Sequence, residues 1–217
     1  QDPDMAAGLS VLMATLSLTG CEPTLGVYDP PIAWQASVAV GRPNRGTLRR
    51  AVQVPAQGPN HLTYDPARRS VPNRPWRRWG TDRTVRTTLC VIEEFRHTRP
   101  DAPRVLIGDV SLPHGGPFGP RYGGLGHVSH QNGRDIDVYY PRWDLKEAAP
   151  KHLADVDLVR AQELVDRFVA AGATLIVVGP DTGLVVSGRR TKLERRAKHD
   201  DHMHVRFPAP RPGTPIS

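Results

Sequence analysis

The chain has 217 residues, a formal net charge of +7 and a hydrophobic content of 38%, which is enough for a folded core. Its 20 glycines and 22 prolines exclude a long-helix protein and predict many turns, short strands and long loops. Only two cysteines are present, Cys21 and Cys90, which excludes a cysteine-rich zinc finger and a multi-disulfide framework and leaves their pairing open. The charge would attract nucleic acid, anionic lipid or anionic cell-wall polymer, but the scattered arginines form no nucleic-acid-binding module.

The N-terminal stretch has the composition of an export signal. Residues 5–18 are small and apolar, and they lead into Leu18-Thr19-Gly20-Cys21. This ending resembles the lipobox of bacterial lipoproteins, although no Lys or Arg precedes the apolar run. The run is too short to span a membrane. We expect an exported protein of the periplasm or cell envelope, in which a lipidated Cys21 would be a membrane anchor; the alternative is an ordinary N-terminal helix with a buried cysteine.

The remaining elements follow from turn residues and hydrophobic periodicity. Residues 22–60 predict loops with one or two short strands, and residues 61–80 a long ordered loop. Apolar residues at helical spacing predict helices over 84–96 and 155–171. Apolar or alternating runs predict these strands: 104–112, 135–140, 174–178, 183–186 and 202–207. The third and fourth of these strands are close enough for a hairpin, and residues 192–198 read as one helical turn or a charged loop.

Two stretches concentrate the residues that can bind a metal ion. Residues 126–140 read GHVSHQNGRDIDVYY, and residues 199–206 read HDDHMHVR. Together they hold five of the nine histidines: His127, His130, His199, His202 and His204. A lone histidine is usually a surface or hydrogen-bonded residue, so the prediction rests on the combination. A six-glycine loop over residues 113–126 leads into the first stretch, as is common for functional loops.

Strand geometry would let these stretches form one site. Side chains two residues apart on a strand share a face, so Asp135 would lie beside Asp137, and His202 beside His204. A catalytic zinc ion takes three protein ligands and keeps one position open. We therefore predict a zinc site, and the lack of an H-E-x-x-H motif excludes the zincin class of metalloprotease. The residues alone do not choose between the two aspartates as ligand.

The complete pattern resembles a known family. H-x-x-H-x-x-G-x-D-x-D with a later H-x-x-H-x-H-V-R is similar to the penicillin-insensitive murein endopeptidases. These belong to a group of zinc peptidases that includes the D-Ala-D-Ala metallopeptidases and the hedgehog signalling domain. The segments IGDVSLPHGG and WRRWGT also look like the family, so the resemblance covers residues 60–207.

The resemblance implies a role for each motif residue. His130, Asp137 and His204 would be the ligands of one Zn²⁺ ion. His202 would be the catalytic base. Three secondary residues would lie near the ion and shape substrate binding, proton transfer or ligand orientation: His127, His199 and Asp135.

The resemblance also implies the reaction. A zinc-activated water would hydrolyse the peptidoglycan cross-link between D-alanine and the diamino acid of the neighbouring stem peptide. The same zinc site could serve a D,D- or L,D-carboxypeptidase that trims stem peptides. A non-catalytic zinc-containing cell-wall-binding module is a further alternative, against which the presence of His202 argues. A nucleic-acid partner is not expected.

We expect an α+β fold in which a small antiparallel sheet carries the zinc site on one face and helices flank it, with long Pro/Gly-rich loops. The expected organisation is an export segment over residues 1–21 and a Pro/Gly-rich segment over 22–60. The zinc peptidase domain would follow over 61–207, with a flexible tail over 208–217.

Overall fold

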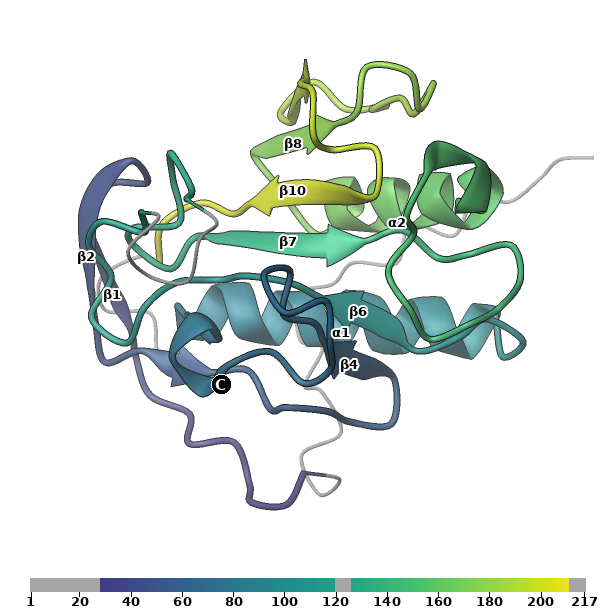
Figure 1. The fold of residues 1–217 in the computed structure, drawn as a ribbon. Helices are drawn as coiled ribbons and strands as arrows, with labels where there is room; N and C mark the ends of the chain where they lie inside the picture. The colour runs from purple at the N-terminus through teal and green to yellow at the C-terminus, as the bar shows by residue number, and fades with distance from the viewer. Residues whose placement is uncertain (1–27, 120–125, 211–217) are drawn as a thin grey trace, which may run out of the picture.

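The computed structural model describes residues 28–119 and 126–210, and its centre is a six-stranded sheet (Figure 1). The strand order is β4-β6-β7-β10-β8-β9. In chain order these strands are β4 (His61–Thr63), β6 (Val105–Ile107), β7 (Asp135–Tyr139), β8 (Leu175–Val178), β9 (Lys192–Arg195) and β10 (His202–Arg206). The predicted export segment, including Cys21, lies outside the described residues.

Two helices and two small sheets complete the fold. The helices α1 (Asp82–Thr98) and α2 (Leu158–Ala170) both lie behind the large sheet in the view of Figure 1. Short 3-10 helices span Pro75–Arg77 and Leu153–Asp155. The small sheets pair β1 (Val38–Arg42) with β2 (Arg45–Arg49), and β3 (Val52–Gln53) with β5 (Trp79–Gly80). The α+β class is confirmed, and the large sheet is mixed, with three antiparallel pairings at its centre and a parallel pairing at each edge.

Alternation along the strands separates the core from the site. Ile136 and Val138 of β7 are fully buried in the main core, as is Val205 of β10. This core also contains the apolar faces of both helices, so it lies between the helices and the sheet. The residues that alternate with them, including Asp137 and His204, therefore lie on the opposite face of the sheet.

One predicted strand is absent, and three short strands, β4, β5 and β9, form where no strand was predicted, the first two within the expected loop over residues 61–80. Residues 183–186 form no strand, and β8 pairs in parallel with β9 instead. This apolar run is a loop instead. Its Leu184 packs into the core, while Val185 is half exposed. The charged segment of β9 is an edge strand, which hydrogen-bonds to a neighbour, β8, on one side only. Of its residues, Leu193 packs against the core, and the others are charged.

No helix in residues 28–119 or 126–210 has the length and apolar character needed to cross a bilayer. Cys90, which lies buried within α1, is disulfide-bonded.

A buried histidine gives the fold a pH dependence of its own. His61 at the start of β4 is 0% exposed, and a ring nitrogen lies 3.2 Å from the carbonyl oxygen of Pro55. Burial lowers the pKa of His61 to about 4, outweighing the hydrogen bond to that carbonyl. The folded state therefore keeps the ring neutral, while the unfolded chain protonates it near its ordinary pKa of 6.5.

We predict that His61 lowers the free energy of unfolding by about 3 kcal/mol as the pH falls from 6.5 to 4. Urea unfolding at half-unit pH steps, compared between the wild type and His61→Gln, isolates this contribution because all other titrating groups are shared. The variant should lose less stability than the wild type over this interval. Parallel stability curves for the two proteins would contradict the prediction.

Candidate metal centre

The register of two neighbouring strands brings the two histidine stretches together. β7 and β10 pair antiparallel, with His204 opposite Asp137 and Arg206 opposite Asp135. The pairing continues past β7, where the Phe207 N–H donates to the Arg134 carbonyl at 3.0 Å. Residues 67 positions apart thereby share one face of the sheet.

His130 reaches this face from the loop that enters β7. Its backbone has φ +66°, a left-handed conformation that is uncommon outside glycine, and its N–H donates to Asp135 Oδ2 at 2.9 Å. Its Nδ1 lies 2.7 Å from the carbonyl oxygen of Val110, which can only accept, so this nitrogen carries the hydrogen. The lone pair of Nε2 is then directed at the strand pair.

Three ligand atoms form a triangle of the size that zinc requires. His130 Nε2 lies 3.0 Å from His204 Nδ1 and 3.3 Å from Asp137 Oδ1, and His204 Nδ1 lies 3.2 Å from Asp137 Oδ1. Ligand atoms about 2.0–2.1 Å from a tetrahedral zinc ion lie about 3.3 Å from one another. The three residues are only 1–6% exposed, so the ligand atoms are held within the packed structure on the face of the sheet. The donor set therefore fits a zinc ion.

A second grouping overlaps with this triangle. His127, His130 and Asp137 each offer a ligand atom within 4.8 Å of the others, so this group can also hold a metal ion. The grouping that includes His204 is tighter by more than 1 Å. We favour it because its spacing matches that of tetrahedral zinc coordination.

Asp135 holds two of the clustered histidines in place. Its Oδ2 accepts the His130 N–H, and its Oδ1 lies 3.3 Å from His204 Nε2. Arg206 Nε donates to the same Oδ1 at 2.6 Å and compensates the buried charge. A histidine that binds a metal through one ring nitrogen commonly donates the other N–H to a carboxylate, which fixes its orientation. Asp135 occupies that position behind His204.

The electrostatics of the cluster favour a bound cation. Burial alone would raise the pKa of Asp137, yet His130 and His204 hold it well below its usual value. Burial alone would lower the pKa of His204, but Asp135 and Asp137 raise it to about 9. The ionised carboxylates of Asp135 and Asp137 thus stabilise the positive charge of a protonated His204. A metal ion that binds His204 would displace that proton.

His202 lies on the same face, two residues before His204 at the start of β10. Its Nδ1 is 2.6 Å from Asp201 Oδ1, so Nδ1 carries the hydrogen and Nε2 is left as the basic nitrogen. Burial lowers the pKa of His202, but the Asp201 bond and nearby carboxylates raise it above its ordinary value. Its ring packs near Tyr139 at 5.3 Å and His199 at 4.9 Å between centroids. His199 itself contacts the Ala197 carbonyl, and burial lowers its pKa.

A buried carboxylate that sequence reasoning did not select lies behind His127. Asp109 is 0% exposed, accepts from Arg77 Nε at 2.6 Å, and lies 2.8 Å from His127 Nε2. Burial opposes ionisation, but the Arg77 and His127 bonds lower the pKa of Asp109 to about 2. An ionisable residue within the apolar run IGDVSL was the available signal for this site. Nothing in the sequence around Arg77, 32 positions away, indicated that it would be the partner of Asp109.

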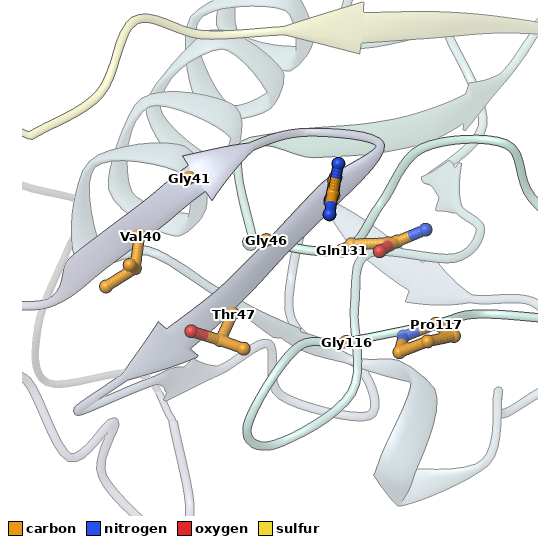
Figure 2. Close-up of a pocket in the computed structure, with 8 residues that line it drawn as sticks. Val40, Gly41, Gly46, Thr47, Gly116, Pro117 and Gln131 are labelled. Atoms are coloured by element: carbon orange, nitrogen blue, oxygen red, sulfur yellow. The ribbon is translucent and has the colours of Figure 1, made fainter.

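Two hollows flank the glycine-rich loop beside the cluster. One, of about 380 Å³, lies between the β1–β2 hairpin and Gly116–Pro117, with Gln131, the neighbour of His130, on its wall (Figure 2). The other, of about 340 Å³, is lined by Trp76 and residues 112–115. Neither hollow is lined by the clustered histidines, so the candidate metal centre is defined by its side-chain distances alone.

Comparison with protein-family models identifies a family for this chain. A family model described as penicillin-insensitive murein endopeptidase matches residues 39–176. The matched segment contains His127, His130 and both aspartates of β7, while β10 with His202 and His204 follows it. No curated protein matches the chain.

We predict that Asp135→Asn weakens zinc binding about 10- to 100-fold, because the amide is a poorer partner for His204 and for the His130 N–H. Competition against a chromophoric chelator measures the affinity. Asp181→Asn, at an exposed position, is the control and should bind zinc as the wild type does. Unchanged affinity in Asp135→Asn, with its circular dichroism spectrum intact, would show that Asp135 does not support the ligands.

Proposed function

The chain belongs to the penicillin-insensitive murein endopeptidases, and from this premise we propose that it is a zinc-dependent hydrolase of the peptidoglycan cross-link between D-alanine and a diamino acid. The observation that carries the proposal is the triangle of His130, Asp137 and His204, with edges of 3.0–3.3 Å. This triangle lies on the face of the sheet opposite the main core.

In this proposal the three triangle residues hold one zinc ion. When bound, zinc supplies a Lewis acid that polarises the scissile carbonyl and makes water a nucleophile near neutral pH. His130 is oriented for this task through the Val110 carbonyl, and His204 through Asp135. Both supporting bonds leave the ligand nitrogen with a free lone pair.

His202 is proposed as the general base. Asp201 fixes the hydrogen on Nδ1, so Nε2 accepts a proton from the attacking water and later returns it to the leaving amine. His202 and His204 share one strand face, which supports action on the same bound substrate. His127 and His199 flank the two ends of the cluster and are proposed to contact the substrate.

The family implies an enzyme of the cell envelope, and we propose that the chain is exported to the periplasm. The disulfide at Cys90 supports this proposal, since disulfides persist in oxidising compartments. The apolar residues 5–18 are proposed as the export signal.

We predict different losses for two active-site variants. His204→Ala should lose both bound zinc and activity, whereas His202→Ala should keep about one zinc per chain and lose about 10²- to 10⁴-fold in turnover. Cross-linked muropeptide dimers followed by mass spectrometry report turnover, and elemental analysis reports zinc. His97→Ala, at an exposed position in α1, is the histidine control and should match the wild type.

The products separate the competing functions. Conversion of dimers to monomers identifies an endopeptidase, and release of only a terminal D-alanine identifies a carboxypeptidase. Zinc binding with neither product would point to a wall-binding module. A wild-type protein that binds no zinc would overturn the metal site.

A further inference from the structure

The buried carboxylate of Asp109 has every acceptor position filled by a donor. Its Oδ1 accepts from Arg77 Nε at 2.6 Å and from Asn73 Nδ2 at 3.0 Å. Its Oδ2 accepts from Arg77 Nη2 and lies 2.8 Å from His127 Nε2. The backbone is fixed as well, because the Asp137 N–H donates to the Asp109 carbonyl at 3.0 Å.

This arrangement determines which nitrogen of His127 carries hydrogen. An ionised carboxylate only accepts hydrogen bonds, and Arg77 keeps Asp109 ionised. Nε2 of His127 must therefore be the N–H. In the neutral ring, Nδ1 then has a lone pair and acts as an acceptor.

That lone pair faces a second acceptor. His127 Nδ1 lies 3.9 Å from Asp137 Oδ2, whereas Oδ1 of Asp137 faces His130 and His204. Two acceptors at this separation repel each other unless one hydrogen-bond donor lies against both. The pair is therefore suited to a donor group.

Stacked side chains keep His127 in this orientation. Its ring lies parallel to Phe118, with centroids 4.9 Å apart and an interplanar angle of 11°, and its other neighbour is His130 at 4.2 Å. The Arg77 guanidinium packs over the Phe118 ring at 4.6 Å from its centroid. The same arginine thus bonds Asp109 and covers the ring that supports His127.

We propose that Asp109, held by Arg77 and Asn73, is a positioning residue that fixes His127 as the Nε2–H tautomer, so that His127 Nδ1 and Asp137 Oδ2 together accept an N–H of the bound peptide. The assignment of the N–H to the substrate rests on the proposed endopeptidase function. The tautomer rests on the contacts alone.

The tautomer is measured directly on the metal-free protein. Long-range ¹H–¹⁵N correlation spectra, assigned with a His127→Gln variant, should show His127 with a protonated Nε2 and an unprotonated Nδ1. The opposite tautomer in the wild type would overturn the proposal without reference to activity or to any variant's folding.

Asp109→Asn tests the cause. Its amide oxygen can stay with Arg77 Nε and Asn73, which leaves its NH₂ group facing His127 and favours the Nδ1–H tautomer. We expect this shift in the spectrum and a fall in kcat/KM of about 10- to 100-fold on muropeptide dimers. Asp65→Asn is the matched control, because Asp65 is also 0% exposed and pairs with Arg74 at 2.5 Å. The Asp65→Asn variant should leave both the His127 spectrum and kcat/KM unchanged.

The outcomes separate this inference from the proposed function. An unshifted His127 spectrum in a folded Asp109→Asn protein would overturn the positioning role. A shifted spectrum with unchanged kcat/KM would overturn the acceptor role. If the wild type shows the Nε2–H tautomer but cleaves no dimers, the endopeptidase proposal fails while the tautomer assignment holds.

Discussion

The antiparallel pairing of β7 with β10 is the constraint on which the site depends. The pairing sets His204 opposite Asp137 on one face while Ile136 and Val205 enter the core on the other. A slip of one residue would exchange the two faces of a strand, burying a charged ligand and exposing an apolar side chain. The hydrophobic core therefore enforces the geometry of the candidate metal centre from the opposite face of the sheet.

The histidine stretches and their strands could be predicted from the sequence because their information is local. Alternation gives β7 and β10, and helical spacing gives α1 and α2, with boundaries displaced by a few residues. Local patterns failed at residues 183–186, which were predicted as a strand but form a loop, and at β9, which was not predicted as a strand. A parallel edge strand is chosen by a partner far along the chain, and its own charged residues resemble a loop.

The candidate site was also predictable only where its information is local. The histidines and the Asp135/Asp137 pair are visible as a pattern, but both aspartates share one face and so look equivalent. The structure distinguishes them by their partners: Arg206 bonds Asp135, while Asp137 lies within 3.3 Å of both His130 and His204. Asp109 and its arginine remained hidden because a buried ion pair is recognised only when both members are brought together.

The glycine of the first motif links the ligand loop to a helix. Gly133 has φ +71°, its carbonyl accepts the Thr81 N–H at 2.9 Å, and a Cβ there would lie 2.6 Å from the Leu48 side chain. Thr81 also caps α1 by accepting from the Thr84 N–H at 3.1 Å. Thr81 thus joins the first turn of α1 to the loop that carries His130. Fraying of that turn would release the loop of His130 as well, so the geometry of the candidate metal centre depends in part on a helix end that contributes no ligand to it.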